Sequence, residues 1–272
     1  MGSTVYADQA RARVMAVEHA DRPGSELRTI GSAADTHQRA FVADSAAQLL
    51  SRQRELAVVI DRIEPEADGV VSLCLTDPDG GRLPAWTPGA HVDVVLPSGR
   101  QRQYSLNGDP ADRGRYRIVV RHIADGGGGS SEIHRRLRAG DRLLVRGLGN
   151  TFPFLEAPQY LFVAGGIGIA PILPMVCAAE RAGTPWRLMY FGRSRSRMPF
   201  LCELARLTGG DVVVRADDEF GRPNPRAIFE QTRTGATVYV CAPPPLAEAA
   251  RQVLALHDPT AALYTERFSP VS

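Results

Sequence analysis

A glycine-rich loop lies between an apolar run and a helical pattern at residues 164–171. The stretch Ala164-Gly165-Gly166-Ile167-Gly168-Ile169-Ala170-Pro171 directly follows a run of apolar residues. Glycine lets the backbone approach a phosphate closely, and Pro171 suits the first turn of a helix, whose free N–H groups attract anions. The dinucleotide fingerprint G-x-G-x-x-G is only half present, because Pro171 replaces its third glycine and Gly192-Arg193-Ser194, not an acidic residue, ends the next strand. The loop predicts a nucleotide site unlike a standard Rossmann site; the alternative is a strand-to-helix turn without a ligand.

A second group of polar residues occurs in the run Arg102-Gln103-Tyr104-Ser105-Leu106-Asn107. The planar guanidinium of Arg102 suits a phosphate, the ring of Tyr104 offers a face to another aromatic ring, and Ser105 adds a short hydroxyl. Strand alternation puts Arg102 and Tyr104 on one face. The alternative is an exposed edge strand with a surface arginine.

A third group is the run Gly126-Gly127-Gly128-Gly129-Ser130-Ser131, which leads into a helix predicted over residues 131–138. A glycine run before a Ser-capped helix start presents backbone N–H groups and the positive end of the helix dipole to an anion. We expect Gly140 to end this helix as its C′ residue. A flexible hairpin loop is the alternative.

An antiparallel β-barrel is the fold that the pattern predicts for residues 55–153. Apolar and polar residues alternate with a period of two, for example Val92, Val94 and Leu96 against His91, Asp93 and Val95. Turn clusters such as Asp77-Pro78-Asp79-Gly80-Gly81 separate the runs at the short spacing of a small barrel.

An α/β fold with a parallel sheet is predicted for residues 154–272. Strand patterns at 160–164, 187–191, 212–215 and 237–241 are separated by helical patterns at 171–182, 199–207, 224–231 and 246–256. Ligands of such a sheet bind beyond the carboxyl ends of its strands. Residues 1–54 read as a partly helical N-terminal extension that carries no recognisable chemistry.

The overall composition excludes several classes of function. All 32 basic residues are arginine, so neither a Schiff-base lysine nor a Walker lysine exists, and a net charge of +2 gives little attraction to nucleic acid or membrane. The four cysteines lack the spacing of zinc or iron–sulfur ligands, so we expect no metal site. No apolar run is long enough to cross a membrane and no secretory signal is present, so we expect a cytoplasmic protein.

Taken in order, these motifs resemble the ferredoxin-reductase-like flavoproteins. The series is completed by Cys241-Ala242-Pro243 at a strand end and by Glu266-Arg267-Phe268 near the terminus. Within that superfamily the chain is most similar to the group of phthalate dioxygenase reductase and vanillate demethylase reductase, over about residues 55–269. The resemblance implies a barrel that holds a flavin, followed by a nucleotide-binding α/β domain.

The resemblance also implies roles for individual residues. Arg102 would bind the flavin phosphate together with Gly128, Gly129 and Ser130, while Tyr104 would pack on the isoalloxazine. Ser105 near the flavin N5, Cys241 near the nicotinamide and Phe268 near the flavin face are the expected catalytic residues. The remaining expected cofactor-binding residues are Gln103, Val119, Arg121, Gly166, Gly168, Ala170, Pro171, Arg193 and Ser194. Ala170 and Ala242 depart from the family pattern, which has Thr and Gly at these positions.

FMN is the expected flavin, because both phosphate-binding elements converge on one phosphate and the barrel has no adenine-binding signature. The resemblance favours NADH as the nucleotide. NADPH is the alternative, because the run Arg193-Ser194-Arg195-Ser196-Arg197 has the residue types that bind a 2′-phosphate, although it also reads as a solvated charge run.

Members of this group usually continue into a plant-type 2Fe-2S ferredoxin domain, whereas this sequence ends at Ser272 without cluster cysteines. We therefore expect the ferredoxin domain to be absent. The predicted function is an NAD(P)H-dependent flavin reductase that passes electrons to a ferredoxin domain or carrier, and from there to a Rieske-type or other oxygenase. The alternatives are a stand-alone enzyme that releases reduced flavin and a non-enzymatic flavin-binding module.

Overall fold

A computed structural model describes residues 55–230 and 232–266 of the 272-residue chain. The N-terminal extension predicted over residues 1–54 therefore lies outside the described residues. The described residues contain one antiparallel and one parallel β-sheet. Both sheets belong to the same compact unit. No helix in this described part is long and apolar enough to cross a membrane.

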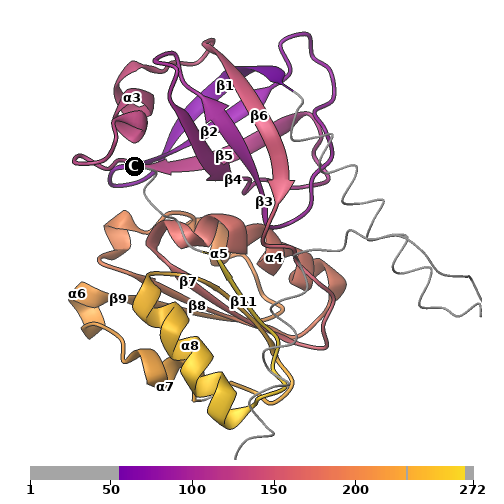
Figure 1. Ribbon diagram of the computed structural model, residues 1–272, viewed down its shortest axis with the longest axis vertical. Helices are drawn as coiled ribbons and strands as arrows, with labels where there is room; N and C mark the ends of the chain where they lie inside the picture. Colours follow the sequence, from indigo (N-terminus) through magenta and orange to yellow (C-terminus); the bar gives the residue numbers. More distant parts are fainter. Residues whose placement is uncertain (1–54, 231, 267–272) are drawn as a thin grey trace, which may run out of the picture. The chain divides into compact units, whose positions relative to one another are not determined.

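The first sheet is antiparallel and has six strands in the order β4-β3-β6-β1-β2-β5 (Figure 1). Its strands are β1 (Leu56–Ala67), β2 (Val70–Thr76), β3 (Ala90–Val95), β4 (Gln101–Ser105), β5 (Arg115–Arg121) and β6 (Arg142–Asn150). A bridge between Leu106 and Ile118 joins the chain just after β4 to β5, so the two edges of the sheet meet and close the barrel. The predicted barrel fold is confirmed. Its interior is filled by alternating apolar residues such as Val92, Val94 and Ile118.

The helix in the barrel segment is α3 (Gly129–Arg136), which begins and ends earlier than predicted. The prediction that Gly140 ends this helix is wrong, because the backbone is already extended at Leu137. Gly140 instead adopts φ +93° in the turn before β6, where its N–H donates to the carbonyl of Ile60. A left-handed glycine thus serves a turn rather than a helix end.

The second sheet is parallel and has five strands in the order β11-β10-β7-β8-β9. These strands are β7 (Tyr160–Gly165), β8 (Trp186–Gly192), β9 (Asp211–Ala216), β10 (Thr237–Cys241) and β11 (Leu263–Glu266). The main helices are α4 (Ile169–Ala182) and α8 (Pro244–His257), and the shorter ones are η1 (Gly166–Gly168), η2 (Arg195–Arg197), α5 (Leu201–Leu204), α6 (Asp217–Phe220) and α7 (Pro225–Phe229). The predicted parallel α/β fold is confirmed, with β11 as a strand that the sequence pattern did not indicate.

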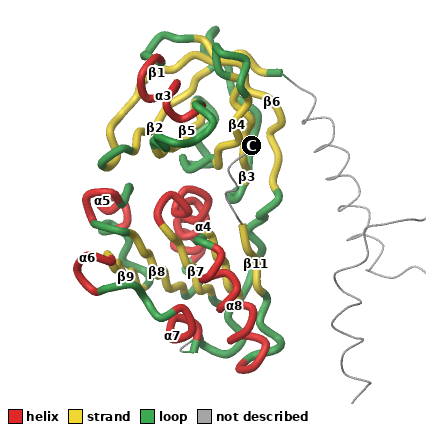
Figure 2. The backbone as a smooth tube through the Cα atoms, turned by 60° about the vertical axis from the view of Figure 1, so that its left-hand side comes forward, coloured by secondary structure: helices red, strands yellow, loops and turns green. Residues whose placement is uncertain are grey.

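Helices cover both faces of the parallel sheet (Figure 2). Residues of α4 pack with Phe162, Leu188 and Tyr239 on one face, while residues of α7 and α8 pack with Val163 and Val240 on the other. Strands that are buried on both faces form nearly continuous apolar runs, which is why short apolar runs marked them in the sequence. Because β10, β7 and β8 are parallel neighbours in this sheet, their carboxyl ends lie side by side at one edge.

The helix predicted over residues 199–207 is reduced to α5. The residue before α5 is Phe200, which has φ +66°. After α5, the N–H groups of Thr208 and Gly209 donate to the carboxylate of Glu180. This long-range contact replaces the bonds that would continue the helix.

Candidate functional site

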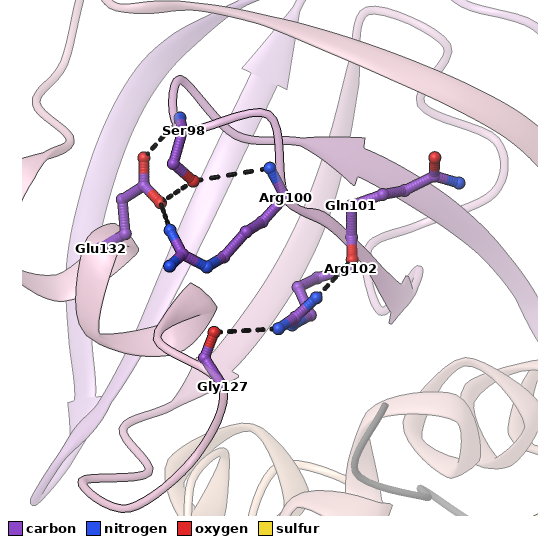
Figure 3. Close-up of polar contacts among 6 residues, drawn as sticks. All are labelled: Ser98, Arg100, Gln101, Arg102, Gly127 and Glu132. Atoms are coloured by element: carbon purple, nitrogen blue, oxygen red, sulfur yellow. Dashed lines mark hydrogen bonds and ion pairs between the residues drawn. The ribbon is translucent and has the colours of Figure 1, made fainter. Parts of the chain in front are cut away.

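Arg102 lies against the first residue of α3. Its Nη2 donates to the carbonyl of Gly127 at 3.0 Å and its Nη1 to the carbonyl of Gln101 at 2.8 Å (Figure 3). A Cβ added at Gly129 would lie 2.9 Å from Cγ and Nε of Arg102, so any larger residue there would have to displace this side chain. The structure thus brings together a strand arginine and a glycine-led helix start that are 27 residues apart in the sequence.

The start of α3 is built differently from the predicted Ser-capped start. The N-cap residue is Gly128 in the left-handed conformation at φ +79°, and no side chain caps the helix. The hydroxyl of Ser130 instead accepts a hydrogen bond from the backbone N–H of Ile123 at 3.1 Å. The prediction of a serine cap is therefore wrong, although Gly128, Gly129 and Ser130 do form the first turn. Glycine's access to positive φ makes this capless entry possible.

A buried carboxylate that the sequence analysis missed anchors α3 to the β3–β4 turn. Glu132 has a side chain only 6% exposed, and it accepts hydrogen bonds from both the N–H and the hydroxyl of Ser98. Arg100 lies 3.7 Å from the same carboxylate, and its guanidinium is 3.6 Å from the Cβ position of Gly128 (Figure 3). Two arginines, Arg100 and Arg102, therefore flank the helix start. The R-x-R spacing on an alternating strand was the signal that could have found Arg100.

Tyr104 is half-buried on the face of β4 that also carries Arg102, as strand alternation predicts. Burial raises the pKa of Tyr104 to about 12, so the phenol is neutral at physiological pH. Gln103 is exposed on the opposite face, so the structure does not bring its side chain to this group. Ser105 is buried at the end of the strand and pairs in register with His91.

Residues of strand β5 in the barrel pack against the parallel sheet and its glycine loop. Val119 is buried in the same apolar cluster as residues of α4. Arg121 is exposed, and its Nη1 lies 3.9 Å from the Cβ position of Gly166. The structure thus places Arg121 beside the loop that the sequence assigns to the nucleotide.

The glycines of that loop have a packing role that sequence reasoning did not foresee. A Cβ at Gly168 would lie 2.0 Å from the carbonyl oxygen of Cys241, and one at Gly165 would lie 2.6 Å from Cδ of Pro243. Both glycines are therefore required by the end of β10, whatever ligand the loop takes. Gly166, at φ +55°, is required by its backbone conformation. Ala170 and Pro171 are buried in the first turn of α4.

Cys241 and Glu266 lie opposite each other at the ends of β10 and β11. Burial raises the pKa of the Cys241 thiol well above its ordinary value, so the thiol stays protonated. Burial also raises the pKa of Glu266 to about 7, and among the described residues its Oε2 has no hydrogen-bond partner. In the sequence, Glu266 stands out only as part of the motif Glu266-Arg267-Phe268. Phe268, the third expected catalytic residue, lies outside the described residues.

Changing Glu266 to glutamine is expected to remove a pH dependence of stability. The folded protein keeps the carboxyl proton up to pH about 7, whereas the unfolded chain loses it near the ordinary pKa of 4.5. Unfolding between these values releases a proton, so stability falls as the pH rises from about 4.5 through 7. Relative to the wild type, E266Q should gain on the order of 2 kcal/mol between pH 5 and pH 8.

Urea unfolding at pH 5 and pH 8 measures this difference. The control is Glu248→Gln, because the Glu248 side chain on α8 is 56% exposed. An unchanged pH dependence in E266Q would contradict the raised pKa.

The arginine–serine run after β8 lies at the same edge of the sheet. Arg193 is exposed, and its carbonyl accepts the N–H of Asp218 at 3.2 Å, while the hydroxyls of Ser194 and Ser196 are 3.3 Å apart. Arg195 is not free, because Glu219 in α6 accepts from its Nε.

Two ion pairs connect the barrel to the helices of the parallel sheet. Arg117 of β5 binds both carboxylate oxygens of Glu203 at 2.6 and 3.0 Å, and Arg181 of α4 lies 3.4 Å from Asp109. A cavity of about 290 Å³ is lined by these four residues and their neighbours. Because these arginines already face carboxylates, the cavity does not offer a free anion site.

Comparisons with known proteins identify relatives of this architecture. No model of a known protein family matches the chain. The chain is 39% identical over 196 residues to the reductase subunit of tert-butanol monooxygenase / tert-amyl alcohol desaturase of Aquincola tertiaricarbonis, covering 70% of this chain and 57% of the relative. It is 37% identical over 207 residues to the phthalate 4,5-dioxygenase reductase subunit of Pseudomonas putida, covering 74% and 64%. It therefore spans less than two thirds of the length of either relative.

Two further matches cover more of the relative. The carnitine monooxygenase reductase subunit of Escherichia coli (strain K12) is 32% identical over 226 residues, which is 81% of this chain and 70% of the relative. The solved structure of phthalate dioxygenase reductase, described as a modular structure for electron transfer from pyridine nucleotides to [2Fe-2S], matches with a TM-score of 0.73 and 32% identity. That match covers 79% of this chain and 68% of the solved one.

Proposed function

Because the chain belongs to the family of oxygenase reductase subunits that includes phthalate dioxygenase reductase, we propose that it is an NADH-dependent flavin oxidoreductase that supplies electrons to an oxygenase. The reductase subunits named above support this proposal. The proposed route runs from NADH through FMN to a 2Fe-2S ferredoxin domain or carrier, and from there to a Rieske-type or other oxygenase. We also propose a cytoplasmic location, which suits the use of NADH.

The contact of Arg102 with the first turn of α3 is the observation that carries the proposal. A fixed guanidinium and the N-terminal end of a helix both stabilise a phosphate, and here they meet at Gly129. The N–H of Gly128 already donates to the carbonyl of Gly126, so the donors left for a phosphate are the Arg102 guanidinium and the later N–H groups of the first turn. The chemistry of these donors fits a flavin phosphate. We favour FMN over FAD because Arg102 and the first turn of α3 converge on a single phosphate position.

Each residue of the site has a proposed role in binding or orientation. Arg102 and the turn Gly128–Ser130 would hold the phosphate, with Arg100 adding positive charge. Tyr104 would offer its neutral ring to the isoalloxazine, and Ser105 a hydroxyl near N5. When bound, the flavin supplies the redox chemistry by accepting a hydride and releasing single electrons.

Residues at the edge of the parallel sheet are proposed to bind the nucleotide. The loop Gly165–Gly168 and the buried first turn of α4 would receive the nucleotide, with Arg121 beside them. Cys241 would provide a neutral, apolar contact for the nicotinamide, because its raised pKa keeps the thiol protonated. The same proposal divides the chain into a flavin-binding domain that ends at residue 153 and a nucleotide-binding domain that begins at residue 154.

Replacing Arg102 with glutamine is the test of this function. Loss of a charge-assisted hydrogen bond to the phosphate should weaken FMN binding by about 2 kcal/mol, which is about 30-fold. Quenching of flavin fluorescence measures the affinity, and riboflavin, which lacks the phosphate, is the matched ligand. The wild type should bind FMN far more tightly than riboflavin, and R102Q should lose most of that preference.

Arg135→Gln is the matched control, because Arg135 is an exposed arginine in the last turn of the same helix. It should bind FMN like the wild type. Steady-state oxidation of NADH with ferricyanide tests the activity itself. A wild type that binds no flavin, that retains FAD in preference to FMN, or that oxidises NADH only when excess free flavin is added would overturn the corresponding part of the proposal.

A further inference from the structure

The acidic turn after β9 faces the arginine run after β8. Asp217, Asp218 and Glu219 form the first three residues of α6, directly after the last residue of β9. The two strands are neighbours in parallel register, with Gly192 opposite Ala216. Carboxylates that are 20 or more residues away from the arginines in the sequence are thereby brought to the same edge of the sheet.

Two contacts fix this arrangement. The N–H of Asp218 donates to the carbonyl of Arg193 at 3.2 Å, which joins the two turns through their backbones. The Nε of Arg195 donates to both carboxylate oxygens of Glu219, at 2.7 and 3.0 Å. The two side chains are 48% and 37% exposed, so the pair lies where a ligand could reach it.

The Arg195–Glu219 pair lies at the position expected for the adenosine ribose of a bound dinucleotide. In an α/β sheet the pyrophosphate of a dinucleotide lies at the helix start after one strand, and the ribose 2′ position lies at the end of the next strand. Those elements here are α4 after β7 and the Arg193–Arg197 run after β8. Glu219 therefore places negative charge where a 2′-phosphate would have to bind, and it occupies Arg195, a cation that such a phosphate would need.

A 2′-hydroxyl meets no such obstacle. It is neutral, and it can donate a hydrogen bond to a carboxylate. In the described part of the chain Arg193 and Arg197 make no ion pair, so Arg195 is the cation of this run that a 2′-phosphate would gain if Glu219 were removed.

We propose that Glu219 is a specificity-determining residue that makes the site select a nucleotide with a free 2′-hydroxyl over its 2′-phosphorylated counterpart. This inference rests on the proposed function, because it assigns the preference within the same nucleotide site. Under this proposal, the run of three arginines does not make the site an NADPH site.

The test compares 5′-AMP with adenosine 2′,5′-bisphosphate, which differ only by the 2′-phosphate, as ligands of the flavin-loaded protein. Isothermal titration at low salt measures both affinities without turnover. The wild type should bind 5′-AMP at least as tightly as the bisphosphate. Glu219→Gln should raise the affinity for the bisphosphate by about tenfold and leave that for 5′-AMP within about twofold, the scale of one partly exposed charge-assisted contact.

Two further variants separate the charge effect from the position effect. Asp211→Asn removes the acid of an exposed ion pair with Arg187 at the other end of β9, and it should change neither affinity. Arg195→Gln combined with E219Q should lose most of the gain, because the released guanidinium provides it. The ratio of kcat/KM for NADPH to that for NADH should follow the same order.

The outcomes distinguish the inference from the function on which it rests. A wild type that prefers the bisphosphate, or an E219Q protein whose preference is unchanged, would overturn the role of Glu219 while leaving the reductase proposal intact. If neither mononucleotide nor NADH binds to any variant, the nucleotide site itself is wrong and both proposals fail.

Discussion

Replacing Gly168 with alanine is expected to destabilise the protein by about 3 kcal/mol and to weaken nucleotide binding as well. The added Cβ would lie 2.0 Å from the carbonyl oxygen of Cys241 and 2.8 Å from its carbonyl carbon. Both are backbone atoms in a central strand of the sheet, so no side-chain rotation can relieve the clash. Either the end of β10 or the start of α4 must move.

Urea unfolding measures the loss of stability, and the affinity for 5′-AMP measures the displacement of α4. The control is Gly108→Ala, whose Cβ would make an ordinary 3.4 Å contact with Arg117, so its cost should stay below about 1 kcal/mol. If G168A unfolds at the same urea concentration as the wild type, Gly168 is not packed as tightly on Cys241 as described. Intact stability with weakened binding would assign the glycine to the ligand instead.

Replacing Arg117 with methionine should cost about 3 kcal/mol, because it leaves several partners of one guanidinium unpaired. Besides its ion pair with Glu203, Arg117 donates from Nε to the Asn107 side-chain oxygen at 2.8 Å and from Nη2 to the Asn107 carbonyl at 2.9 Å. It also lies 4.9 Å from the ring centroid of Phe200. Its side chain is only 20% exposed, so water replaces these contacts poorly.

A double-mutant cycle with Glu203→Gln separates the ion pair from the other contacts. We expect a coupling energy of about 1 to 2 kcal/mol between the two positions, which lies above the range of exposed pairs. The control is Arg187→Met, which breaks an exposed pair with Asp211 and should change stability by less than about 1 kcal/mol. An Arg117→Met protein as stable as that control would show that the ion pair with Glu203 does not join the barrel to the second sheet.

The sequence by itself determined both sheets and the three glycine or arginine motifs. Alternation at Val92 and Val94 is a local property of a half-buried strand, and the apolar run before Gly165 is a local property of a strand buried on both faces. The cap at Asn224 is equally local, because its side chain accepts the N–H of Arg226 two residues later. Such features depend on neighbours in the sequence, so they can be read from it.

Only the tertiary structure decided how these motifs work. The length of α5 depends on Glu180, the need for glycine at position 168 depends on Cys241, and the state of Arg195 depends on Glu219. The raised pKa of Glu266 likewise follows from burial at the end of β11, an edge strand that the sequence pattern did not reveal. Each of these properties arises from atoms far apart in the chain, and distances and desolvation between such atoms exist only once the two sheets have formed.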